Sequence, residues 1–391
     1  MLDLLREYLA VNTSYPTPDY DSVAELFRAH AARDGFEFKQ ITLPSGRPVI
    51  IITLQGSSSL PSLALNHHMD VVPAQDRTQW THEPFRGVVD QGRIYGRGTQ
   101  DCKGLGVVQY GALQLLKRTI GVPERTIHLL MVPDEEIGGF TGVKELVDHP
   151  AFESLAIGYL LDEGIPSGNP DELCIKVDER TPIQIRVTSR GPSGHASGLF
   201  HPNCVHTLID FLSSAVSFQR SQREQSEGKQ AGSYISMHIT GLDVDTRSLN
   251  VIPSRASACI DVRVPSGISM DEGIGIIEGL VSAHPGVSYE ILATSVERLQ
   301  PIDSESSFFR LVENALEAHA IKPRAFAFEA TTDSRFYSSR GIQTLGLTPF
   351  VSVPNLHGID ESIAVDEFYK GILVMYTIIS RFNDSQLKEI V

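Results

Sequence analysis

Short apolar runs alternate with longer amphipathic segments through the first half of the chain, a pattern that indicates strands and helices in turn. Asp21–Asp34 is predicted as a helix because Val23 and Phe27 share one face. Ser22 and Glu25 have the spacing of a capping box at its start. Further strands are predicted at "VIIITL", "LALN", "TIHLLMV" and "AIGYLL", and further helices at Lys103–Lys117 and Gly142–Asp148. This order favours an α/β fold, in which helices flank a mixed or parallel sheet.

The pattern changes near Arg180, where strand-like runs such as "IQIRVTSRG" and "SRASACIDVRV" follow one another with two helical segments between them. That order favours a small α+β domain with an antiparallel sheet, ferredoxin-like in its sequence of elements. After Leu299 the first pattern resumes. We therefore predict a larger domain of residues 1–179 and 299–391, interrupted by a smaller domain of residues 180–298. A chain of 391 residues also exceeds what one hydrophobic core usually holds.

The charge balance bears on the partners of the protein. Lys and Arg number 33 against 48 Asp and Glu, for a formal net charge of -15, and the chain has no run of basic residues. Nucleic acid and anionic membrane surfaces are therefore not expected as partners. No apolar run approaches the roughly 20 residues of a spanning helix. The 4 cysteines have no C-x-x-C spacing, so we expect a cytoplasmic protein without a disulfide framework.

Side chains able to bind a metal follow the predicted strand "LALN". In the continuing stretch "HHMD", His68 and Asp70 fall on the same side of the chain, since a strand repeats every two residues. Asp70 is then placed to accept the outer N–H of the His68 ring and fix its tautomer for a metal. His67 faces the other way, and we interpret it as a bystander.

Carboxylates follow two other predicted strands, in "PDEEIGG" and "LLDEGIP". Adjacent carboxylates repel one another and are costly to bury, unless a cation faces them. Asp101 lies before a predicted helix, where it is either an N-cap or a carboxylate that bridges two metal ions. The carboxyl ends of parallel strands share one edge of a sheet, and ligands collect there. Imidazole mixed with carboxylate is typical of zinc sites.

Taken together, these stretches resemble the dizinc amidohydrolases and exopeptidases that include aminoacylase-1, succinyl-diaminopimelate desuccinylase and the glutamate carboxypeptidases. The resemblance extends from "PTPDY" to "HGIDESI". It is strongest toward aminoacylase-1, through "LNHHMDVVPA", "RGTQDCKG", "TIHLLMVPDEEIGG", "LDEGI", "GPSGHAS", "NVIPSRASACIDVRV" and "TTDSRF". The order and length of these motifs make the resemblance specific.

The resemblance implies two Zn²⁺ ions per subunit and a catalytic role for Glu135 as general base, with Asp70 orienting a histidine ligand. Asp101 would bridge the two ions, and the peptide bond that follows it would be cis. The metal ligands implied are His68, Asp101, Glu136, Glu163 and His357.

The resemblance also implies that residues 180–298 form a lid and dimerisation domain. His195 would then act in the active site of the partner subunit of a homodimer, and Asn250 would lie near the substrate. Arg263 and Arg335 are candidates for binding the substrate carboxylate, because a guanidinium offers two parallel donors. The alternative for each arginine is an ordinary salt bridge or structural hydrogen bond.

The activity implied is hydrolysis of N-acyl-L-amino acids to a carboxylic acid and a free L-amino acid. A dipeptidase or carboxypeptidase would use the same ligands. A catalytically inactive binding protein of the same fold would lack some of them, and a mononuclear hydrolase would leave Glu136 or His357 without a metal. The chain departs from the aminoacylase-1 pattern at His67, Cys102 and Gly104, which affects the expected shape of the pocket.

Overall fold

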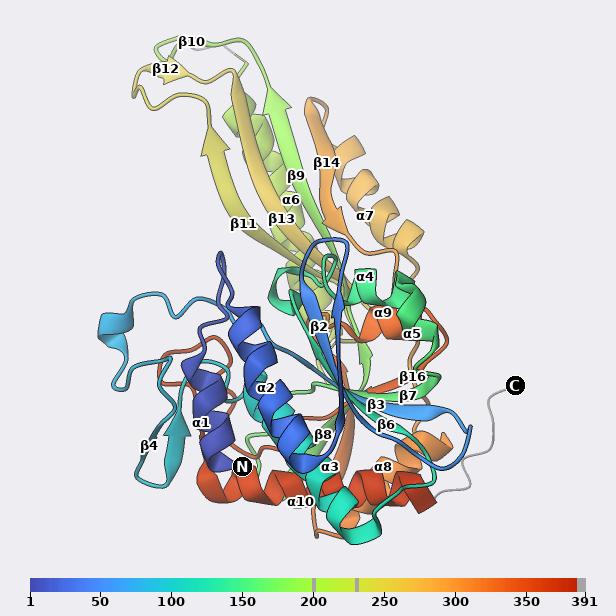
Figure 1. Cartoon of the computed structure of the whole chain (residues 1–391). Coiled ribbons are helices and arrows are strands. Elements are labelled where there is room, and N and C mark those ends of the chain that lie inside the picture. Colours follow the sequence, from blue (N-terminus) through green and yellow to red (C-terminus); the bar gives the residue numbers. More distant parts are fainter. Residues whose placement is uncertain (199–201, 229–231, 385–391) are drawn as a thin grey trace. The chain divides into compact units, whose positions relative to one another are not determined.

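The computed structural model describes residues 1–198, 202–228 and 232–384, which form two compact units (Figure 1). The first unit comprises Met1–Val177, Ile302–Ala325 and Thr332–Val391. The second comprises Asp178–Pro301 and Phe326–Thr331. The short segment Phe326–Thr331 thus belongs to the second unit, although the rest of that unit ends at Pro301.

A mixed eight-stranded sheet forms the centre of the first unit, in the order β1-β2-β6-β3-β7-β16-β8-β15. The strands in that order are β1 (Glu37–Thr42), β2 (Pro48–Leu54), β6 (Ile127–Val132), β3 (Ser62–His68), β7 (Ile157–Asp162), β16 (Gln343–Gly346), β8 (Glu172–Glu179) and β15 (Lys322–Phe328). β3 pairs in parallel with β6 and with β7, and β7 pairs in parallel with β16. The carboxyl ends of β3, β6 and β7 therefore lie at the same edge of the sheet.

Helices cover both faces of this sheet, and successive strand residues point into different cores. Ile50 and Ile52 of β2 enter one core, whereas Val49 and Ile51 enter the other. The larger core includes residues of α1 (Leu2–Ala10), α2 (Tyr20–Asp34), α3 (Lys103–Ile120), α8 (Ser307–Glu317) and α10 (Val365–Asp384). The smaller core includes residues of α4 (Val143–Asp148), α5 (Pro150–Glu153) and α9 (Ser334–Ser338). Burial on both faces explains why the central strands are continuous apolar runs.

The start of α2 differs from the capping box predicted for Ser22 and Glu25. The helix begins at Tyr20, and its N-cap is Asp19, whose carboxylate accepts a hydrogen bond from Ser22 N at 3.1 Å. Asp19 thus takes the N-cap role that the prediction gave to Ser22, and its carboxylate satisfies the free N–H group of Ser22. A capping box does form in the second unit at the start of α7 (Met270–Ser282).

A small sheet that the sequence pattern did not predict joins two distant parts of the first unit. It consists of β17 (Ser362–Ala364), β5 (Arg93–Tyr95) and β4 (Val88–Asp90), in that order. Strands of three residues are too short to give a recognisable apolar alternation. Their pairing places the segment before β17 beside the segment after β5.

The second unit contains a four-stranded antiparallel sheet in the order β11-β13-β9-β14. Helices α6 and α7 pack on this sheet and share its hydrophobic core. A separate two-stranded ribbon pairs β10 with β12. The bounds are β9 (Thr181–Arg190), β10 (Gly194–His195), α6 (Cys204–Gln225), β11 (Ser236–Val244), β12 (Val251–Ile252), β13 (Arg255–Val264) and β14 (Val287–Thr294).

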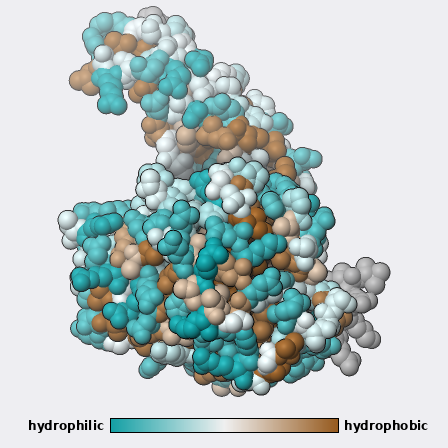
Figure 2. Space-filling model, viewed as in Figure 1, coloured by the Kyte–Doolittle hydropathy of each residue, from teal (hydrophilic) through white to brown (hydrophobic). Residues whose placement is uncertain are grey.

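The surface of the molecule is mainly polar on the face seen in Figure 2. Hydrophilic residues cover most of that face, and hydrophobic residues lie between them in small groups. Within the three described ranges, no helix combines the length and the apolar character needed to cross a membrane.

Candidate metal centre

Parallel strands bring polar side chains to one edge of the eight-stranded sheet. β3 ends at His68, and Glu163 directly follows β7. The turn after β6 carries Glu135 and Glu136. Asp101 comes from a different element, the loop that leads into α3. The chain thus supplies the edge with one imidazole and several carboxylates from separate elements, as the sequence predicted.

His68, Asp101 and Glu163 form what we call the inner group. His68 Nε2 lies 2.9 Å from Asp101 Oδ1 and 3.5 Å from Glu163 Oε2. All three residues are buried. Cys102, whose peptide bond to Asp101 is cis as the resemblance implies, also has its sulfur within 4.8 Å of the ligand atoms of this group.

Asp101, Glu136 and His357 form the outer group. His357 Nε2 lies 3.2 Å from Asp101 Oδ2 and 3.1 Å from Glu136 Oε2. The His357 side chain is 51% exposed, so this group lies toward solvent. The two oxygens of Asp101 therefore face two different histidines, which is the arrangement expected of a bridging carboxylate.

The side chains of both groups fit a divalent cation. In each group the potential ligand atoms all lie within 4.8 Å of one another. Oε1 of Glu136 is buried and has no hydrogen-bond partner among the described residues. A buried carboxylate oxygen without a donor is costly unless a cation is near it. Nitrogen and carboxylate oxygen donors together favour zinc over calcium or magnesium.

The electrostatics of the imidazoles also indicate a site for positive charge. Hydrogen bonds to Asp101 and Glu136 raise the pKa of His357 to about 10. Burial alone would lower the pKa of His68, but the thiol and carboxylates around it raise that pKa well above its ordinary value. Burial raises the pKa of Glu163 to about 7. Such a concentration of negative charge favours protons or metal ions at the site.

The three consecutive acidic residues of "PDEE", Asp134 to Glu136, each have different neighbours. Asp134 is buried in the left-handed conformation at φ 70°, and its carboxylate contacts Arg47 and accepts a hydrogen bond from Tyr20 at 3.0 Å. Glu136 reaches the outer group. Burial, together with the nearby charge of Glu163, raises the pKa of Glu135 well above its ordinary value. Asp134 is thus paired with Arg47 and Glu136 with His357, whereas Glu135 faces further negative charge.

Asp70 supports the site through the main chain more than through the imidazole. Its carboxylate accepts hydrogen bonds from Glu135 N at 3.2 Å and Glu136 N at 3.0 Å. His68 Nδ1 lies 2.8 Å from the main-chain oxygen of Asp70 and 3.7 Å from its carboxylate. The carbonyl oxygen thus fixes the tautomer of His68, and the carboxylate holds the turn that carries the two glutamates.

His67 faces away from the metal centre, toward α3. Its Nδ1 lies 3.2 Å from Gln109 Oε1, and burial lowers the pKa of the ring to about 3. A Cβ atom at Gly106 would lie 2.2 Å from His67 Nε2. α3 and β3 therefore approach each other so closely that only glycine fits at this position.

Arg335 is buried near the turn of Glu135 and Glu136. Its guanidinium donates hydrogen bonds to Gly138 O at 2.6 Å and Thr332 O at 2.5 Å, and it stacks on Phe336 at 4.1 Å. The hydrogen bond to Gly138 O ties Arg335 to the end of that turn.

The remaining predicted residues belong to the second unit. His195 in β10 is exposed, and Ala196 N beside it donates a hydrogen bond to Asn250 O at 2.9 Å, so His195 and Asn250 lie in one ribbon. Arg263 lies on β13 and makes two hydrogen bonds to Asp261, at 2.6 and 3.1 Å. The contacts of Arg263 correspond to the salt bridge considered as its alternative.

Glu361 was not singled out by sequence reasoning, although it stands in the segment "HGIDESI". It is fully buried, and its carboxylate lies 2.8 Å from Arg97 Nη1 and 2.7 Å from Gln100 N. The signal that could have identified it is an acidic residue four positions after a predicted histidine ligand.

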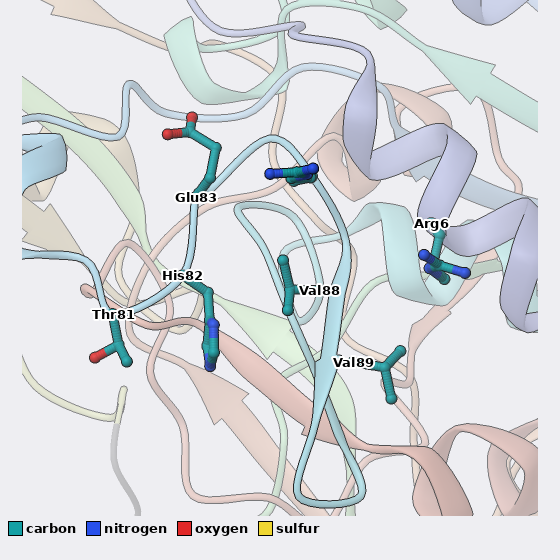
Figure 3. A pocket seen from close by; sticks show the side chains of 7 residues that line it. Arg6, Thr81, His82, Glu83, Val88 and Val89 are labelled. Atoms are coloured by element: carbon teal, nitrogen blue, oxygen red, sulfur yellow. The ribbon is translucent and has the colours of Figure 1, made fainter.

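A pocket of about 700 Å³ lies elsewhere in the first unit (Figure 3). None of the residues shown to line it is a predicted site residue. Arg6 and His82 at its wall lie near acidic partners, Asp3 at 3.5 Å and Asp90 at 3.4 Å. Because it contains no residue of the inner or outer group, we do not place the catalytic site in this pocket. The residues that line it are Arg6, Thr81, His82, Glu83, Arg86, Val88 and Val89.

Comparison with known proteins gives concordant matches. The model of the family described as Peptidase family M20/M25/M40 matches residues 64–381. Aminoacylase-1 of Mus musculus is 32% identical over 386 residues, covering 96% of this chain and 94% of that protein. An M20 family metallo-carboxypeptidase from Sulfolobus solfataricus has the same fold, with a TM-score of 0.76, 16% identity, and coverage of 98% of this chain and 99% of that chain. A dinuclear metal-binding M20 family peptidase from Bacillus subtilis has a TM-score of 0.68 and 14% identity, with 98% of each chain covered.

Proposed function

Because this chain belongs to the peptidase family M20/M25/M40, we propose that it hydrolyses N-acyl-L-amino acids to a carboxylic acid and a free L-amino acid. The observation that carries the proposal is Asp101, whose two oxygens face His68 and His357 at 2.9 and 3.2 Å. A carboxylate in that position can bridge two metal ions, and many hydrolases of amides and esters use a pair of metal ions. The similarity to aminoacylase-1 over nearly the whole chain supports the substrate class.

We assign two Zn²⁺ ions to each subunit. The inner group would hold one ion and the outer group the other, with Asp101 shared between them. Zinc bound there would lower the pKa of a coordinated water toward about 7 and polarise the scissile carbonyl group. The dinuclear metal-binding peptidase of the same fold supports the number of ions, and the imidazole and carboxylate donors support zinc.

Glu135 is the proposed general base. It lies beside Glu136 in the turn held by Asp70, and burial and Glu163 raise its pKa. Cations in the two neighbouring groups would lower that pKa again, so that the carboxylate can accept a proton from the attacking water. Water adds to the carbonyl carbon, Glu135 passes the proton to the amide nitrogen, and the C–N bond then breaks to release the amino acid.

The second unit is the proposed lid and dimerisation domain. We propose that the protein is a homodimer in the cytoplasm, and that His195 hydrogen-bonds the developing oxyanion in the site of the other subunit. The exposed position of His195 supports this role, as does the hydrogen bond from the neighbouring Ala196 N to Asn250 O, which keeps the two predicted residues in one ribbon. In mixtures of His195→Ala and Glu135→Ala chains, mixed dimers should recover turnover. Verified mixed dimers without turnover would refute action between subunits.

The substrate carboxylate is proposed to bind Arg335, with Arg263 as a second candidate. The hydrogen bonds from Arg335 to Gly138 O and Thr332 O orient its guanidinium, a group whose parallel donors match a carboxylate. Turnover of N-acetyl-methionine amide, which lacks the carboxylate, is compared with turnover of N-acetyl-methionine to test this contact. Equal turnover of the acid and the amide would rule out a carboxylate contact by either arginine.

The proposed activity is tested with a panel of N-acetyl-methionine, an unmodified dipeptide and a succinylated diamine, each with and without added zinc. We expect N-acetyl-methionine to give the highest kcat/KM, and chelation to abolish its turnover. A dipeptide cleaved faster than N-acetyl-methionine would identify a peptidase instead. Absence of turnover on all three substrates, with two zinc ions bound, would indicate a binding protein that has kept the fold.

A further inference from the structure

We propose that Glu361 and Arg97 form a clamp that positions the ligands of the outer metal ion, and that this clamp controls the affinity for that ion more than the affinity for the inner one. Glu361 is a positioning residue in this scheme, since it contacts neither proposed ion. The inference rests on the proposed function, because it presupposes that the two groups bind two ions.

The carboxylate of Glu361 binds the main chain of the segment that ends in Asp101. It accepts hydrogen bonds from the N–H groups of Gly98 at 3.2 Å, Gln100 at 2.7 Å and Asp101 at 3.2 Å. Glu361 is fully buried. Three N–H groups that converge on one buried charge fix the path of the chain tightly, because each would be costly to leave unsatisfied. The bridging carboxylate is therefore held from behind its own main chain.

Arg97 extends the same contact to the second ligand-bearing segment. Its Nη1 donates to Glu361 at 2.8 Å, and its Nη2 donates to His357 O at 3.1 Å. The side chain is 2% exposed and lies over the ring of Trp80 at 5.1 Å. One buried ion pair thus connects Asp101 with His357, which are two of the three ligands of the outer group.

The outer group depends on this connection more than the inner group does. His68 and Glu163 stand at the ends of β3 and β7, where strand pairing fixes the main chain. His357 lies within the described segment 347–361, which contains neither helix nor strand, and its φ is 62°. A ligand on such a segment needs a specific contact to keep its position.

Glu367 offers a matched control for Glu361. It is also a buried glutamate that accepts hydrogen bonds, from Val351 N, from Ser352 Oγ at 2.6 Å and from Ala364 N at 3.3 Å. These contacts hold the region on either side of His357, but they do not reach the segment of Asp101. The two glutamates therefore differ mainly in whether they join the ligand-bearing segments.

The experiment is a titration of the metal-free full chain with Zn²⁺ by calorimetry, for the wild type and for the Glu361→Gln and Glu367→Gln variants. We expect two ions to bind to the wild type. In Glu361→Gln we expect the weaker site to lose affinity by about 10- to 100-fold, the range seen when groups behind metal ligands are changed, and the tighter site to change less than about twofold. In Glu367→Gln both affinities should stay within about twofold, even where thermal unfolding shows lower stability.

A second variant keeps the inference testable if Glu361→Gln does not fold. Arg97→Lys keeps the positive charge beside Glu361 but loses the fork that reaches His357 O. We expect this variant also to bind the outer ion more weakly while its affinity for the inner ion is kept. Added Zn²⁺ should restore its turnover. Binding of two ions with wild-type affinities in the folded variants would overturn the inference, as would equal weakening in Glu367→Gln. A wild type that binds only one ion would instead contradict the proposed function.

Discussion

The inner and outer groups share Asp101, yet they are held in different ways. The inner ligands His68 and Glu163 are buried at strand ends, so the hydrogen bonds of the sheet determine where they stand. The outer ligand His357 is half exposed on an irregular segment, and a buried ion pair connects that segment to Asp101. Strand pairing at a sheet edge can therefore fix the main chain of a ligand, whereas a ligand from a loop requires polar contacts to do so.

The shared residue provides the largest expected effect. Asp101→Asn removes negative charge from both groups, so both ions should be lost or weakened. Losing the several kcal/mol that a metal ion contributes to charge stabilisation would lower turnover on the order of 10³-fold or more. Turnover of N-acetyl-methionine and metal content per chain measure this. The exposed Asp366 provides the control, since Asp366→Asn should change neither. An Asp101→Asn protein that retains two ions would contradict the shared role of this carboxylate.

Two neighbouring glutamates allow a finer comparison of chemistry with metal binding. Glu135→Gln should keep both ions but lower kcat by about 10² to 10⁴, the usual contribution of a general base. Glu136→Gln should instead lose the outer ion, because it removes a charged member of that group. Parallel measurements of kcat and metal content separate the two outcomes. A Glu135→Gln protein with more than a tenth of wild-type kcat would exclude Glu135 as the base.

The smallest expected effect concerns His128, a buried histidine on the same sheet whose ring nitrogens contact a hydroxyl and a carbonyl oxygen. His128 on β6 lies 2.9 Å from Thr53 Oγ1 and 3.1 Å from Leu155 O, and burial lowers its pKa to about 4. The unfolded chain, with an ordinary histidine pKa near 6.5, binds the proton more readily. Stability should therefore fall as the pH drops from about 6.5 to about 4, by up to about 3 kcal/mol.

His128→Gln should flatten that part of the stability profile, because glutamine has no proton to gain in this range. Urea unfolding between pH 7 and pH 4 measures the free energy of unfolding for both proteins. The slope is the readout, so a constant loss of stability in the variant does not affect the result. Equal slopes would show that His128 does not set the acid sensitivity, in contrast to the carboxylate-bound His357 with its pKa near 10.

The sequence predicted those parts of the site that depend on strand order. Apolar runs followed by His68, Glu136 and Glu163 place these residues at the carboxyl edge once the strands are parallel, and the structure has β3, β6 and β7 in that arrangement. The orientation of His67 away from the metal centre also followed from strand alternation, and the structure places its ring against Gln109 of α3. Predictions of this kind succeed because a strand repeats every two residues over its whole length.

Other features could not be predicted, because they depend on main-chain groups from distant segments. The partners of Glu361 are N–H groups about 260 positions earlier in the chain, and an N–H group leaves no trace in the sequence. The hydrogen bond from His68 to the carbonyl of Asp70, in place of its carboxylate, is of the same kind. Asp19, which caps α2, was missed because Ser22 offered a competing pattern only three residues away. Local patterns identify candidate residues, but tertiary contacts decide which atom of each residue is used.

The close contact between Gly106 and His67 has a consequence for how the protein can change over evolution or in the laboratory. Any side chain at position 106 would act as a wedge, since its first carbon would overlap the imidazole ring. The wedge would push the start of α3 away from β3, and with it the bridging carboxylate away from the first histidine. Gly106 therefore sets the distance between the two elements that carry the centre. New substrate preferences are expected to arise from loops beyond the strand ends, where movement leaves that distance unchanged.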